Sequence, residues 1–219
     1  EMHDGLALYI LGFVAGGFLS GFLSGLFNLG GIVRIPILLF LFYIFGFSDS
    51  ILMHLAIGTS LALSLPSSAI NFYKEYKTWK SDDERSHISA FVKGWLLVVV
   101  LGIIAGLAIV RYLPDDLLIW VFILALLFLA IQVFILRDSY SLAERFSNGI
   151  TMAFAAFITG LVSTVTGLSG VLTRSVLRAF AYPWEATYAA AGSGILISVL
   201  GTLGYMVNGL WISGEPPFT

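Results

Sequence analysis

The sequence has no cysteine, few charged residues and only three histidines. The absence of cysteine excludes disulfide bonds, thiolate catalysis and cysteine-ligated metals within these 219 residues. His3, His54 and His87 are scattered and show no spacing typical of metal ligands. Charged residues make up 11% of the chain, against roughly 25% in soluble globular domains. So little charge could not cover the surface of a folded protein in water, which argues against a soluble class.

What the sequence has instead is apolar residues in long runs. Hydrophobic residues make up 58% of the chain, and the mean hydropathy is +0.96. A helix needs roughly 20 apolar residues to cross the hydrocarbon core of a bilayer. Eight segments are predicted, two of them shorter than a spanning helix: 6–27, 31–46, 50–72, 91–113, 117–136, 148–166, 170–182 and 186–208. The sequence therefore predicts an all-α integral membrane protein, a polytopic helical bundle.

The polar connections predict how the bundle is oriented. Basic residues concentrate in the loop 74–93 and recur in the loop 137–147, which places both loops in the cytoplasm by the positive-inside rule. The turn 111–116 then lies outside, together with the N-terminus. With all eight segments crossing, residues 6–27 form a true first span and the segment from Gly149 begins inside. We expect a multi-pass protein of the cell (inner) membrane whose two halves are inverted.

The two halves also resemble each other in sequence. The stretch 21–31 aligns with 160–170, with identical glycine, serine and leucine positions in the same order, and 56–60 aligns with 190–194. The alternative is that small residues recur by chance in membrane helices. The pattern predicts a repeat of residues 1–140 and 148–219, and the loop charges predict that its two copies are inverted. The second copy has about three segments against five in the first, so we expect a longer parent chain or an incomplete repeat.

Each short segment, the second and the seventh, follows a glycine-rich break, at 28–31 and at 167–170. Short, glycine-interrupted segments in corresponding places are a sequence sign of a transporter's binding site. A helix that starts at such a break offers free N–H groups and a positive dipole end to an anion. Glycines at such spacings also let helices pack closely, and both roles can hold: we expect packing from the glycines of 12–25 and the binding site at the two breaks.

Two arginines lie in otherwise apolar segments just after the breaks. Arg34 and Arg174 are one position apart in the repeat alignment, so we expect them to act on one anion. The alternative for both is an interfacial position with the charge among lipid headgroups. Hydroxyls of the 56–60 and 190–194 blocks would add donors, unless they bond to their own helices. The predicted substrate-binding residues are Asn28, Gly30, Gly31, Arg34, Thr59, Ser60, Gly167, Ser169, Gly170, Arg174 and Ser193.

These motifs resemble the sulfite exporter TauE/SafE family. The resemblance rests on the run 21–31, then Pro36, then Ala56 to Ser60, with a weaker second copy at 160–194. It implies transport of small sulfur-containing anions, such as sulfite, sulfonates or thiosulfate, or of related organic anions, by alternating access. The expected partners are the small anion and the lipid bilayer, with homo-oligomerisation open and no nucleic acid.

Three other functions are alternatives to transport. A helix-packing membrane scaffold or an anion channel would use the same glycines. An intramembrane serine protease would explain the Gly-x-Ser-Gly pattern at 167–170, but it needs a histidine base in a later helix and no histidine follows Ser169. We therefore expect no catalytic residue, no metal and no cofactor.

Overall fold

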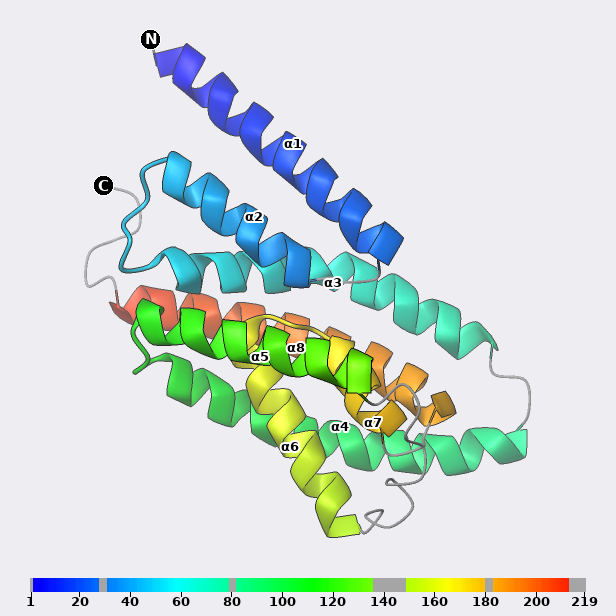
Figure 1. Ribbon diagram of the computed structural model, residues 1–219. Coiled ribbons are helices and arrows are strands. Elements are labelled where there is room, and N and C mark those ends of the chain that lie inside the picture. Colours follow the sequence, from blue (N-terminus) through cyan, green and yellow to red (C-terminus); the bar gives the residue numbers. More distant parts are fainter. Residues whose placement is uncertain (1, 28–30, 79–81, 136–148, 180–182, 213–219) are drawn as a thin grey trace.

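The computed structural model describes residues 2–27, 31–78, 82–135, 149–179 and 183–212. This part of the chain forms eight α-helices and no strand (Figure 1). The helices are α1 (Met2–Phe27), α2 (Gly31–Ile44), α3 (Leu52–Thr78), α4 (Asp82–Val110), α5 (Asp115–Ile135), α6 (Gly149–Thr166), α7 (Val171–Ala179) and α8 (Pro183–Ile212). The predicted all-α, polytopic class is confirmed. The prediction of two short segments is confirmed as well, since α2 has 14 residues and α7 has 9.

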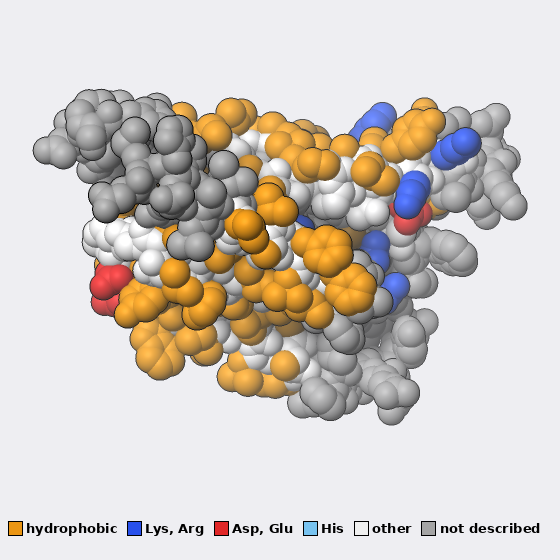
Figure 2. Space-filling model, turned by 90° about the horizontal axis from the view of Figure 1, so that it is seen from above, with side chains coloured by type: hydrophobic (Ala, Val, Ile, Leu, Met, Phe, Trp, Pro, Cys, Tyr) orange, Lys and Arg blue, Asp and Glu red, His pale blue; other side chains and the backbone are white. Residues whose placement is uncertain are grey.

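Four helices within the described residues are long and apolar enough to cross a membrane. Their spans are Leu52–Lys77, Ala90–Val110, Gly149–Thr166 and Thr187–Gly209. Figure 2 shows hydrophobic side chains over the middle of the molecule, whereas Lys and Arg side chains on this face gather mostly toward one end. Exposed apolar side chains in the middle and charges at an end suit a protein surrounded by lipid.

The core lies where α3, α4, α6 and α8 pack together. α3 and α8 are in contact along their lengths and run in opposite directions, while α4 packs on both α6 and α8 (Figure 1). Residues four positions apart share a face of a helix, and α3 buries one such row completely. The fully buried core side chains of these helices include Met53, Ile57, Leu61, Val99, Ile103 and Ile197. α2 lies on α3, α7 lies on α8, and α1 packs mainly on α2.

Local sequence explains where two of these helices begin. α5 follows Pro114, whose carbonyl accepts the backbone N–H of Leu117 at 3.0 Å, and Asp115 and Asp116 occupy the first turn. Acidic side chains at that end are stabilised by the helix dipole. Between α6 and α7 the chain turns at Gly167 and Gly170, whose φ angles are 70° and 74°. These left-handed conformations favour glycine, so the break ends α6 and allows the short α7 to start.

Candidate functional site

The two predicted glycine breaks meet inside the bundle. Gly31, the first residue of α2, lies so close to the turn after α6 that an added Cβ would be 2.6 Å from the carbonyl oxygen of Gly167. A Cβ at Gly167 would in turn lie 2.9 Å from the Cδ1 atom of Ile35. The start of α2 and the turn after α6, which are far apart in the sequence, therefore touch. Asn28 and Gly30 lie outside the described residues.

Replacing Gly31 with Ala should separate these two breaks. The new methyl would collide with a backbone oxygen, which cannot rotate away, so we expect a loss of about 1–3 kcal/mol from overpacking and a lower midpoint of thermal unfolding. The control is Gly17→Ala, because nothing lies within 4 Å of a Cβ at Gly17. Equal midpoints for the two variants would contradict the close contact between the breaks.

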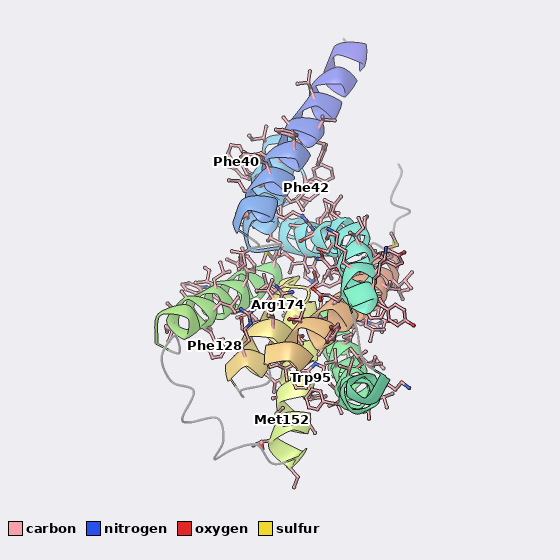
Figure 3. All side chains as sticks on the ribbon, turned by 90° about the vertical axis from the view of Figure 1, so that its right-hand side faces the viewer. Phe40, Phe42, Trp95, Phe128, Met152 and Arg174 are labelled. Atoms are coloured by element: carbon pink, nitrogen blue, oxygen red, sulfur yellow. The ribbon has the colours of Figure 1, made fainter. Side chains whose placement is uncertain are left out.

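A polar pocket of about 150 Å³ opens between α3, α7 and α8. α3 contributes Ser68 and Asn71, and α8 contributes small residues. The full lining is Ser68, Asn71, Ser169, Gly170, Val171, Arg174, Ser175, Arg178, Ala190, Ala191 and Gly194. Figure 3 places Arg174 in the interior of the bundle, whereas Phe40 and Phe128 are exposed on the outside. The described lining holds two arginines and no carboxylate, so it is a positively charged pocket.

Glycines let the three helices approach closely enough to form this pocket. A Cβ at Gly194 of α8 would lie 3.1 Å from the Ser68 hydroxyl of α3, and a Cβ at Gly170 would lie 2.9 Å from the Ala190 carbonyl oxygen. Ser169, Gly170 and Val171 form one wall of the pocket. The N-terminus of α7 therefore borders the pocket, and its dipole adds to the positive potential there.

The structure places the two predicted arginines differently. Arg174 lines the pocket, together with the predicted residues Ser169 and Gly170. Arg34 is buried, and its Nη1 atom donates to the carbonyl oxygen of Ser60 at 3.2 Å and to the Ser64 hydroxyl at 2.7 Å. Its guanidinium therefore ties α2 to α3, one helical turn from the pocket serine of α3. Direct anion binding by Arg34 stays a prediction, and its contacts support a positioning role.

The predicted residues Thr59, Ser60 and Ser193 are not among the residues that line the pocket. Within the described part of the chain, the hydroxyls of Ser60 and Ser193 are buried and have no hydrogen-bond partner. They differ from Ser64, whose hydroxyl donates to the carbonyl oxygen of Ser60 at 2.8 Å. Thr59 is half-buried. Ser193 directly precedes the pocket residue Gly194, whereas Ser60 lies eight positions before the pocket residue Ser68.

Ser68 and Asn71 are pocket residues that the sequence analysis missed. Both follow Ser60 and Ser64 on α3 at spacings of three or four residues, which puts them along one side of the helix. A row of polar positions on an apolar span was a signal that could have identified them. Ser175, which directly follows Arg174, and Arg178, one turn further along α7, were also missed as pocket residues.

A multi-pass helical bundle with a charged pocket between its helices is the architecture of a membrane transporter. The chain belongs to the sulfite exporter TauE/SafE family, whose sequence model matches residues 13–215. It is 26% identical over 197 residues to a probable membrane transporter protein of Methanocaldococcus jannaschii, covering 87% of this chain and 70% of that protein. A probable membrane transporter protein of Haemophilus influenzae is 24% identical over 197 residues, with coverage of 88% and 72%. No solved structure matches the chain.

Family membership supports a transporter rather than an enzyme. The Gly-x-Ser-Gly pattern at 167–170 forms the turn before α7, and Ser169 belongs to the pocket. The described residues that line this pocket with Ser169 include no histidine. The backbone conformation of this turn explains its glycines, so the Gly-x-Ser-Gly pattern does not require a protease.

Proposed function

We propose that the protein transports small anions, most suitably sulfur-containing ones such as sulfite, short sulfonates or thiosulfate, and binds them in the pocket at Arg174. The observation that carries this proposal is a polar pocket inside an apolar bundle whose described lining has Arg174 and Arg178 and no carboxylate. A fixed positive charge in such surroundings is costly unless an anion accompanies it.

The donors around the pocket suit an oxyanion. A guanidinium can give two parallel hydrogen bonds to one sulfonate or sulfite group. Ser68 and Asn71 of α3 offer a hydroxyl and an amide, and the N-terminus of α7 offers a positive dipole end. Donors from three helices could therefore surround one small anion.

Alternating access is the mechanism we propose for transport. The pocket lies between α3 of the proposed first repeat, residues 1–140, and α7 and α8 of the proposed second repeat, residues 148–219. Rocking of one repeat against the other would open a pocket at this boundary to alternate sides. We further propose the cell inner membrane as the location, with the loop 74–93 in the cytoplasm. The gathering of basic side chains toward one end in Figure 2 supports this orientation.

The proposal is tested with purified protein and a matched pair of compounds. Methanesulfonate and thiosulfate should raise the midpoint of thermal unfolding in a saturable way, because a ligand that binds only the folded state stabilises it by mass action, by about 2.7 kcal/mol at a hundred times Kd. Dimethyl sulfone, the neutral analogue of methanesulfonate, should have no effect. Absence of stabilisation by any anion, sulfite included, would contradict the proposed site.

Flux measurements separate a transporter from a channel. In proteoliposomes, uptake of labelled thiosulfate should saturate and should be accelerated by unlabelled thiosulfate on the other side, since alternating access allows exchange. Uptake that rises linearly with concentration and shows no exchange would indicate an anion channel. Anion stabilisation without any flux would indicate a membrane scaffold with an anion site.

A further inference from the structure

A buried pair of titratable side chains joins three helix ends away from the anion pocket. Asp115, in the first turn of α5, is 8% exposed and accepts the backbone N–H of Met53, near the start of α3, at 2.6 Å. Its other carboxylate oxygen contacts the Nδ1 atom of His54. The second ring nitrogen of His54, Nε2, lies 3.3 Å from the carbonyl oxygen of Val110 at the end of α4.

The two contacts of His54 require one more proton than a neutral imidazole and an ionised carboxylate carry together. A backbone carbonyl oxygen only accepts hydrogen bonds, and so does an ionised carboxylate, whereas neutral imidazole has a single N–H. Both contacts of His54 can be hydrogen bonds only if the ring is an imidazolium, or if Asp115 carries the proton and donates it to Nδ1. In either arrangement the pair holds one extra proton between two residues.

The other titratable and charged residues around the pair do not share this proton. Among the described residues, the further titratable side chain packed here is Tyr205 of α8, whose ring centroid is 6.4 Å from that of His54. The Tyr205 hydroxyl is buried and donates to the carbonyl oxygen of Thr164 at 3.2 Å. The charged residues nearest in sequence to the three helix ends are Asp49, Arg111 and Asp116, which are all exposed.

We infer that His54 and Asp115 form a proton-binding site, and that the proton it binds is the coupling ion for transport. The inference on coupling rests on the proposed function. Loss of the proton removes the hydrogen bond of His54 to either Asp115 or the Val110 carbonyl oxygen, which weakens the link between α3 and the α4–α5 end.

α3 and α8 each contribute residues both to this site and to the anion pocket. α3 carries His54 near its start and the pocket residue Ser68 fourteen positions later, about 20 Å along the helix. α8 carries Tyr205 beside the pair and Gly194 in the pocket. A change in how α3 is held at one end therefore reaches the pocket at the other. Coupling between two sites is reciprocal, so anion binding also changes the affinity for the proton.

The proton site is tested without any substrate. Full-length protein with isotope-labelled histidine in lipid nanodiscs should show both ring nitrogens of His54 engaged with hydrogen at neutral pH, in a signal that His54→Gln removes. The Asp116→Asn variant is the matched control, since the adjacent carboxylate is exposed, and it should give the wild-type spectrum. A neutral imidazole with one N–H and an ionised Asp115 in wild-type protein at neutral pH would overturn the inference, and His54→Gln serves only to assign the signal.

Coupling is tested by thiosulfate flux in proteoliposomes with and without a pH gradient. Thiosulfate keeps its charge near neutral pH, so the gradient acts on the protein and not on the probe. We expect the gradient to change wild-type and Asp116→Asn flux several-fold, and to leave Asp115→Asn and His54→Gln flux unchanged. Wild-type flux that ignores the gradient would overturn the coupling. Absence of wild-type flux would instead count against the proposed function, and the spectrum would still decide the proton site.

Discussion

Replacing Arg174 with Gln should remove the stabilisation by methanesulfonate and thiosulfate while the protein still folds. Arg174 lines the pocket and is only partly buried, so its loss leaves no large cavity. A hydrogen bond to a charged group contributes about 1.5–3 kcal/mol, which corresponds to roughly a 10- to 100-fold loss of affinity. Arg174→Lys should recover part of it, because a point charge replaces a fork of two donors. Thermal-shift titration measures both effects.

Two further arginine variants serve as comparisons for Arg174→Gln. Arg111→Gln removes an exposed charge at the end of α4, away from the pocket, and should leave anion stabilisation as in the wild type. Arg34→Gln removes the donor to Ser60 and Ser64. It should lower the unfolding midpoint, whereas thiosulfate should still raise it. Loss of anion stabilisation in Arg34→Gln as severe as in Arg174→Gln, with a sub-additive double variant, would make Arg34 a direct ligand, as the repeat predicted.

Replacing Gly160 with Ala should destabilise the bundle strongly, because α4 and α6 cross there with their backbones in contact. A Cβ at Gly160 would lie 2.3 Å from the carbonyl oxygen of Val99, and one at Gly102 would lie 2.2 Å from that of Phe157. A backbone oxygen at such a distance can be avoided only if the helices separate. We expect a loss of about 1–3 kcal/mol or more, seen as a fall in the thermal unfolding midpoint.

The control for Gly160 is its counterpart in the repeat. Gly21 occupies the aligned position in α1, and nothing lies within 4 Å of a Cβ there. Gly21→Ala should therefore be neutral, or slightly stabilising because alanine is the better helix former. Equal destabilisation by the two variants would mean that the glycine face of α1 is packed against a partner as closely as α4 packs on α6.

The glycines of this chain thus have two physical roles, close packing of helices and formation of the turn at the pocket. Gly102 and Gly160 permit a helix crossing, as small residues commonly do in membranes. Gly167 and Gly170 adopt positive φ angles and create the turn that places the start of α7 at the pocket. Position in the fold, and not residue type, separates these roles.

Much of the architecture could be predicted from the sequence, because membrane insertion is a local property. The length of an apolar run decides whether a segment can span, so the number of helices and the short α2 and α7 were predictable, although α4 begins nine residues before the predicted start and α3 ends six residues after the predicted end. The glycine breaks and the arginine after each were equally visible, since a charge or a glycine cluster in an apolar run has few local explanations. On this ground the sequence predicted Arg174, which lines the pocket.

The tertiary structure alone decided which faces of these helices meet. Most of these helices are apolar on all sides, so their sequences show no periodic apolar face from which the neighbouring helix could be predicted. Arg34 and Arg174 look equivalent in sequence, yet one bonds to α3 and the other lines the pocket. In the sequence His54 is one of three scattered histidines, and nothing there links it to Asp115. Asp115 reaches it from 61 positions away, since the turn after α4 brings the start of α5 to the start of α3. Long-range contacts of this kind depend on packing between helices, which a local pattern does not contain.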